Sequence, residues 1–78
     1  MTSGQPPKYE WGERVAASVD LYNDGSFPGA PADALLVRAG ERGEIVQVGT
    51  QTELDVPIYL VEFDAQRVVG CFEEEITR

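Results

Sequence analysis

Residues 58–71 read Ile58-Tyr59-Leu60-Val61-Glu62-Phe63-Asp64-Ala65-Gln66-Arg67-Val68-Val69-Gly70-Cys71 and contain the clearest strand of this chain. β-Branched and aromatic residues dominate the first six positions, as is typical of strands. In an extended chain, alternate residues from Tyr59 to Phe63 point to one face, whereas Glu62 on the other face indicates solvent. Ile58 and Leu60 share the face of Glu62, so that face is partly covered too. The pattern predicts packing on two sides, as in a very small barrel.

The segment that continues from this strand predicts a hairpin and a helical turn. Asp64-Ala65-Gln66 is short enough to connect the strand to a second one at residues 67–71. The run Phe72–Ile76 then indicates a single helical turn. We therefore expect this half of the chain to be an antiparallel hairpin followed by one helical turn.

Further strands are expected upstream, at residues 13–19, 35–37 and 44–48. Gly40 and Gly43 suit a tight turn just before the last of these strands. The chain at 21–33 is dense in Asn, Asp, Gly and Pro, and predicts a long, ordered loop. A second loop is expected at residues 50–57.

These elements predict an all-β fold, namely a small SH3-like barrel of four to five short antiparallel strands with a helical turn near the C-terminus. An open sheet of three or four strands fits the periodicity almost as well. The first residues combine Thr, Ser, Gly, Gln and two prolines, so we expect a flexible leader at 1–8 and one domain at 9–78. Trp11 is expected in the core because of its large apolar area.

The charge balance argues against several classes of partner. Fourteen acidic residues face six basic ones, which gives a formal net charge of -8. Such a negative field repels phosphate backbones and anionic lipid headgroups, so neither a nucleic acid nor a membrane is an expected partner. The basic residues form no cluster in the sequence: they are Lys8, Arg14, Arg38, Arg42, Arg67 and Arg78.

The cysteine and histidine content indicates a cytoplasmic protein that is not an enzyme. Cys71 is the single cysteine, which excludes an internal disulfide, and the N-terminus lacks the apolar run of a signal peptide. The chain has no histidine, and it shows no nucleophile motif and no Gly-rich phosphate loop before a helix. Metal and cluster sites use several Cys or His ligands, so no cofactor or metal is expected.

Two segments carry a resemblance to a known family. They are Asn23-Asp24-Gly25-Ser26-Phe27-Pro28-Gly29 and Val69-Gly70-Cys71-Phe72-Glu73-Glu74-Glu75-Ile76. The openings Tyr9-Glu10-Trp11-Gly12-Glu13-Arg14-Val15 and Gly40-Glu41-Arg42-Gly43-Glu44-Ile45 fit the same pattern but occur in many SH3-like modules. Together these segments resemble the NifZ family of nitrogen-fixation proteins.

The resemblance implies an accessory maturation factor without catalytic residues. Members of this family are expected to act like chaperones on the immature molybdenum-iron protein of nitrogenase while its iron-sulfur P-clusters are assembled. The alternative is a non-catalytic SH3-like interaction module or a small regulatory subunit of another redox complex, since a fold does not fix a function.

The first candidate for a partner-binding site is the loop that contains Asn23, Asp24, Gly25, Phe27 and Pro28. Loops on small barrels commonly carry function, and Phe27 offers a hydrophobic anchor. An architectural role fits equally well, because Asn and Gly accept left-handed backbone angles and Phe27 can fold back onto the core.

The second candidate is the C-terminal segment with Cys71, Glu73, Glu74 and Glu75. The three glutamates could steer the domain toward a basic partner surface, although charge runs are more often simply solvated. Cys71 could be a transient iron ligand or redox thiol, but a buried, inert cysteine is the more common situation.

Overall fold

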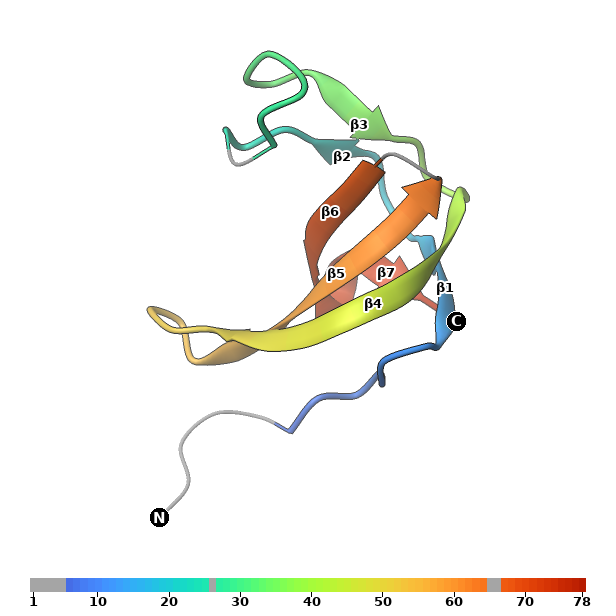
Figure 1. Cartoon of the computed structure of the whole chain (residues 1–78), viewed down its shortest axis with the longest axis vertical. Helices are drawn as coiled ribbons and strands as arrows, with labels where there is room; N and C mark the ends of the chain where they lie inside the picture. Colours follow the sequence, from blue (N-terminus) through green and yellow to red (C-terminus); the bar gives the residue numbers. More distant parts are fainter. Residues whose placement is uncertain (1–5, 26, 65–66) are drawn as a thin grey trace.

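The computed structural model describes residues 6–25, 27–64 and 67–78, and the regular structure of this part is β-strand except for one 3-10 turn (Figure 1). All strand pairs are antiparallel. No helix in the described part is long and apolar enough to cross a membrane. The elements are β1 (Arg14–Ala17), β2 (Leu21–Tyr22), β3 (Leu35–Val37), β4 (Arg42–Gln51), β5 (Val56–Asp64), β6 (Arg67–Phe72), the 3-10 turn η1 (Glu73–Glu75) and β7 (Ile76–Thr77).

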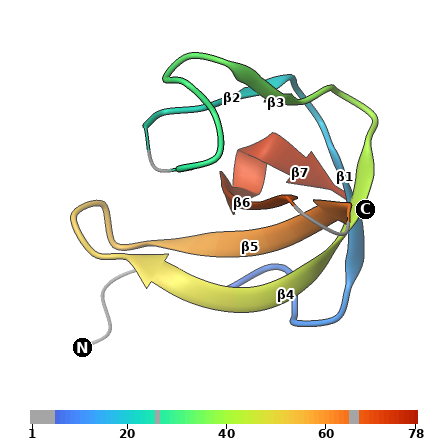
Figure 2. The same cartoon turned by 45° about the horizontal axis from the view of Figure 1, so that its top comes forward.

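Five strands form one sheet in the order β6-β5-β4-β1-β7, and β2 and β3 form a separate pair. The five-stranded sheet must curl, because its two edge strands, β6 and β7, are joined only by η1. In a flat sheet of five strands, the two edge strands would lie about 19 Å apart, because neighbouring strands are about 4.8 Å apart. The four Cα steps from Phe72 to Ile76, which connect these edge strands, reach at most about 14 Å. Figure 2 shows the resulting curved wall, with β2 and β3 lying across from β4 and β5.

The curl encloses one hydrophobic core. Tyr59, Val61 and Phe63 point into it, as the alternation predicts, and Glu62 is exposed. Ile58 and Leu60 are half-buried, so the opposite face is partly covered as expected. The core residues are Tyr9, Val15, Ala17, Leu21, Leu36, Val37, Ile45, Tyr59, Val61, Phe63, Val69, Cys71 and Ile76.

The all-β prediction is confirmed, and so are the antiparallel β5–β6 pairing and the helical turn after β6. The tip of that hairpin, Ala65-Gln66, lies outside the described residues, as do residues 1–5 of the expected leader. The hydrogen-bonded ladders of the described residues do not close into a barrel, because β2 and β3 stay separate from the larger sheet. The SH3-like assignment therefore stays a prediction.

Several details of the prediction were wrong. The described residues form seven strands, more than the four to five expected, because Leu21–Tyr22 and Ile76–Thr77 are two-residue strands that only tertiary pairing supports. The first strand is shorter than residues 13–19. β4 continues past Gly49 to Gln51, because β5 pairs with it as far as Val56. The turn before β4 contains Gly40, with φ 93°, whereas Gly43 already lies in the strand.

Trp11 is not in the core. Its side chain is 77% exposed, and Tyr9 fills the position beside Tyr59 instead, with ring centroids 5.5 Å apart in an edge-to-face arrangement. The turn from Glu10 to Glu13 turns Trp11 outward, with Glu13 N donating to Glu10 O at 3.1 Å. The prediction from apolar area placed Trp11 in the core, whereas the buried aromatic residue of this segment is Tyr9.

Among the residues that the structure describes, no strand lies beside the outer part of the β4–β5 hairpin on either side. β1 pairs with β4 only as far as Glu44, and β6 ends at Phe72, opposite Ile58. We call residues 46–57 the hairpin overhang. In both views it extends away from the rest of the sheet (Figures 1 and 2).

Gly43 allows the close approach that the curl requires. A Cβ atom at this position would lie 2.7 Å from the carbonyl oxygen of Glu62 and 2.7 Å from Val61 Cγ1. Backbone cannot give way cheaply, so a side chain here would force the strands apart. A Cβ at Gly49 would meet only Ile58 Cγ2, at an ordinary 3.8 Å.

We predict that Gly43→Ala lowers the free energy of unfolding by about 2 kcal/mol through overpacking. Gly49→Ala, the matched control in the same strand, should change it by no more than about 0.5 kcal/mol. Urea unfolding followed by tyrosine and tryptophan fluorescence measures both. Equal effects for the two variants would show that the close contact at Gly43 does not limit stability.

Candidate protein-binding site

The loop between β2 and β3 is organised by one buried amide. Asn23 is 2% exposed, and its Oδ1 accepts hydrogen bonds from the backbone N–H groups of Gly25 at 3.0 Å and Phe27 at 3.1 Å. Its Nδ2 donates to the carbonyl oxygens of Phe27 at 3.0 Å, Ala30 at 2.9 Å and Pro31 at 3.0 Å. One side chain therefore ties together residues up to eight positions away, and the loop has a built-in frame.

The structure divides the predicted loop site into a frame and a surface. Asn23 is buried in the frame, and Phe27 is half-buried and packs against the core. Asp24, Gly25 and Pro28 are exposed. Gly25 has φ 101°, which favours glycine. Phe27 thus folds back onto the core, as the architectural reading expected, whereas Asn23 supports the loop through its side chain and not through a left-handed backbone angle. A binding role for the loop residues stays a prediction.

We predict that Asn23→Asp lowers the free energy of unfolding by about 3 kcal/mol at neutral pH. The change replaces a buried donor by a charged acceptor that faces three carbonyl oxygens. Gln47→Glu, the same chemical change on an exposed side chain of β4, should cost no more than about 0.5 kcal/mol. Chemical denaturation of both variants makes the comparison, and similar losses would mean that the Asn23 amide does not hold the loop.

Two of the three glutamates in the acidic turn have structural partners. Glu73 Oε2 accepts from the Tyr59 hydroxyl at 2.7 Å and from the Lys8 backbone N–H at 3.0 Å. Glu75 Oε1 accepts from the Phe72 N–H at 2.8 Å, which closes the turn on itself. The carboxylate of Glu74 makes no hydrogen bond to any described residue, and it is exposed. Glu74 is therefore the glutamate of the turn whose charge is available to a partner.

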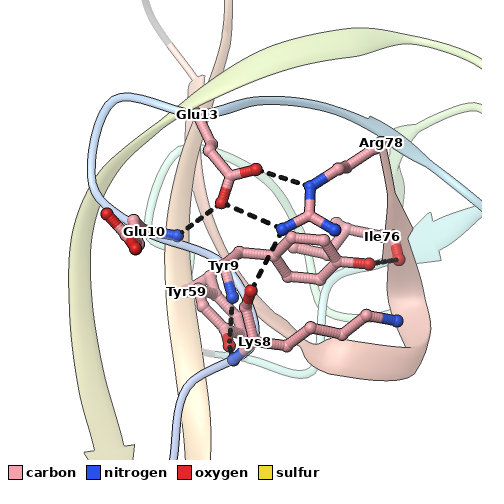
Figure 3. A network of polar contacts seen from close by, with 7 residues as sticks. All are labelled: Lys8, Tyr9, Glu10, Glu13, Tyr59, Ile76 and Arg78. Carbon is pink, nitrogen blue, oxygen red and sulfur yellow. Dashed lines mark hydrogen bonds and ion pairs between the residues drawn. The ribbon is translucent and has the colours of Figure 1, made fainter.

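Through Glu73 the turn connects to Lys8 and Tyr59. Figure 3 shows these two residues in a network that joins segments near both ends of the chain. The Tyr59 hydroxyl also accepts from the backbone N–H groups of Lys8 at 2.8 Å and Tyr9 at 3.2 Å. Burial raises the pKa of Tyr59, and the hydrogen bond to Glu73 raises it further, so the hydroxyl remains a donor.

Arg78 closes this network from the other end. It pairs with Glu13 at 2.6 Å, donates to the carbonyl oxygen of Lys8 at 3.2 Å and lies over the Tyr9 ring at 4.9 Å (Figure 3). The hydrogen bond from Arg78 lowers the pKa of the Glu13 carboxyl. Residues more than sixty positions apart in the sequence thus meet at one end of the molecule, which spacing along the chain does not reveal.

A shallow groove lies between the acidic turn and the hairpin overhang. Its volume is about 170 Å³, and four of its six lining residues are apolar. One of these, Leu54 at the hairpin tip, is 64% exposed. The groove thus combines apolar side chains with the exposed carboxylate of Glu74, and its lining residues are Leu54, Val56, Pro57, Phe72, Glu73 and Glu74.

A second groove lies on the β2–β3 side. It is lined by Phe27, Gly29, Ala30, Leu35, Leu36 and Arg67, and shares no residue with the first groove. Arg67 crosses from β6 to this pair of strands: its Nη1 donates to the Leu36 carbonyl, and its Nη2 lies 3.1 Å from Glu41 Oε1. The two predicted parts of the site, the loop and the acidic turn, therefore line different grooves.

Cys71 lies in the core and faces neither groove. Its side chain is 0% exposed, and its Sγ donates a weak hydrogen bond to the carbonyl oxygen of Val69 at 3.5 Å. Burial, with a smaller effect of Glu75, raises the pKa of the thiol to about 12. The buried position expected for Cys71 is confirmed, and the inertness of its thiol stays a prediction. In the described residues, no group of three or more His, Cys, Asp and Glu side chains could hold a metal ion.

We predict that Cys71 in the native protein does not react measurably with Ellman's reagent at pH 8. The native thiol is enclosed and almost fully protonated at this pH. In the unfolded chain its pKa is about 8.5, so a substantial fraction is the reactive thiolate. Adding urea above the unfolding midpoint should release one equivalent of thiolate. Rapid reaction without urea would show that strand β6 opens often enough for Cys71 to meet a metal or an oxidant.

Comparison with known proteins gives a consistent result. The family model described as the NifZ domain matches residues 6–78. The chain is 42% identical over 71 residues to protein NifZ of Azotobacter vinelandii, covering 90% of this chain and 44% of that protein. It is 40% identical to a NifZ protein of Sinorhizobium fredii, with 91% and 66% covered, and 35% identical to protein NifZ of Klebsiella pneumoniae, with 90% and 47% covered. The chain thus spans about half the length of these relatives, and no solved structure matches it.

Proposed function

This chain belongs to the NifZ family of nitrogen-fixation proteins, and on that premise we propose that it is a non-catalytic accessory factor that binds the immature molybdenum-iron protein of nitrogenase. It assists assembly of the iron-sulfur P-clusters in the manner of a chaperone. The observation that carries the proposal is the family match, which extends over every described residue. Because the relatives are longer, the proposal concerns the part that they share with this chain.

The groove beside the hairpin overhang supports binding of a protein. Apolar lining residues beside an exposed carboxylate suit an apolar side chain flanked by Lys or Arg, because the groove can bury the first and Glu74 can pair with the second. The net charge of -8 adds attraction over a longer range, so association with a basic surface is faster at low salt.

The position of Cys71 supports client binding over iron delivery. A thiol carrier must present its sulfur to the cluster, and this sulfur is enclosed by the core. The chain offers no histidine as a second ligand. In the proposed function the protein therefore acts through its surface and leaves cluster chemistry to other proteins.

We predict that the tagged protein retains P-cluster-deficient molybdenum-iron protein in a pull-down and retains the mature form less. Binding should weaken when salt rises from low to moderate concentration. Glu74→Gln should weaken capture several-fold because it removes the exposed charge of the groove.

Glu62→Gln is the matched control, because Glu62 is an exposed glutamate outside the groove and its substitution changes the net charge equally. Equal capture of mature and immature forms, or no capture of either, would contradict the proposal. That result would favour an interaction module that serves another complex.

A further inference from the structure

Strand β4 has an open edge that starts where β1 leaves it. The last bonds between the two strands run from Gly12 N to Ile45 O at 2.7 Å and from Ile45 N to Glu13 O at 2.9 Å. Before this point the chain has turned away, because Glu10–Glu13 form a turn with Gly12 at φ 90°. From Val46 onward, β4 has β5 on one side and no described strand on the other.

The register identifies which backbone groups face the open side. In an antiparallel pair, residues alternate between facing the partner strand and facing away. Ile45 bonds to Gly12 and Glu13, and a bulge between Ile45 and Gln47 resets the alternation. By this alternation Gly49 and Gln51, opposite Ile58 and Val56, face β5. The N–H and C=O groups of Val48 and Thr50 therefore point to the open side. Pro57, which has no N–H, lies opposite Thr50, as this alternation requires.

The open edge also has an aromatic residue at its start. Trp11 directly precedes Gly12, the residue that makes the last bond to β4, and its side chain is 77% exposed. Tryptophan is the residue type most enriched among the dominant contacts of protein interfaces. A strand added to β4 would continue the line of β1 and meet Trp11 at one end.

We propose that the free edge of β4, residues 46–50, binds an extended segment of the client protein as an added strand, with Trp11 as its side-chain anchor. Main-chain hydrogen bonds to Val48 and Thr50 hold the segment, as in other cases of strand addition. The edge itself, Val-Gln-Val-Gly-Thr, is uncharged, while Glu44 and Glu53 lie beyond its ends. The segment that fits is therefore rich in β-branched residues, free of proline and flanked by Lys or Arg.

A second copy of the chain fits this edge less well than a basic segment does. Two copies would bring together net charges of -8 each, with the glutamates near both ends of the edge approaching one another. The identity of the client, although not the existence of the edge, rests on the proposed function.

Amide hydrogen exchange, measured by NMR residue by residue, tests the inference. In the free protein, the amides of Val48 and Thr50 should exchange fast and those of Gly49 and Gln51 slowly. Adding the peptide Lys-Val-Thr-Val-Lys-Val-Lys at millimolar concentration should slow Val48 and Thr50 by about tenfold or more. The same peptide with its central valine replaced by proline should not. P-cluster-deficient molybdenum-iron protein should give the same protection when it is bound.

The two arms separate the failure of this inference from the failure of the proposed function. Protection by the peptide without binding of the molybdenum-iron protein would keep the edge and reject the client. Binding of that protein without protection of Val48 and Thr50 would keep the client and overturn strand addition. No protection in either arm would also overturn it. Slow exchange of Val48 and Thr50 in the free protein would also overturn strand addition, and so would protection of these amides that grows with the protein's own concentration. Either result would mean that this edge is covered by the chain itself or by a second copy.

Two variants complete the test. Trp11→Ala should weaken binding of the peptide by about tenfold or more, because it removes the anchor. Tyr22→Ala removes an aromatic side chain that is 60% exposed on the separate β2–β3 pair, and it should leave binding unchanged. Equal effects of the two variants, with both proteins folded, would remove Trp11 from the proposed site.

Discussion

The connection between β6 and β7 is the constraint on which the rest of the structure depends. Three residues, Glu73–Glu75, join the two opposite edges of a five-stranded sheet. Ser18 holds the turn in place, with its N–H bonded to the Glu75 carbonyl at 2.9 Å and its hydroxyl to the Glu74 carbonyl at 2.9 Å. A sheet tied in this way has to curl, and the curl gives so short a chain an enclosed core.

The same constraint determines what the acidic turn can do. A run of three glutamates looks like one patch of charge in the sequence, but the turn uses the first and third carboxylates to support itself and the N-terminal segment. Glu74 keeps its charge for solvent or a partner. Carboxylates that accept hydrogen bonds from backbone N–H groups and a tyrosine stabilise the fold, so substitutions at Glu73 or Glu75 alter stability as well as any contact.

Local patterns predicted well what depends on local geometry. The alternation from Tyr59 to Phe63 gave both faces of β5, and the composition after it gave the hairpin and the helical turn. The two-residue strands β2 and β7 were missed because neighbours distant in the sequence create them.

Long-range contacts explain the remaining errors in the site. Trp11 was predicted in the core from its apolar area alone. That area does not reveal which aromatic residue packs against Tyr59, and in the structure this residue is Tyr9. The loop residues were grouped as one candidate site, and that assignment stays a prediction. Only the structure shows that Asn23 is an internal support, since the carbonyl oxygens that its Nδ2 contacts lie four to eight residues away on a path that the sequence does not specify.

The meeting of Lys8 and Arg78 at one end of the molecule has a consequence for architecture. The Arg78 side chain donates to the Lys8 carbonyl oxygen at 3.2 Å, so residues 8 and 78 lie close together. A unit with adjacent ends can sit inside a longer polypeptide as a side branch, without stretching the chain that carries it.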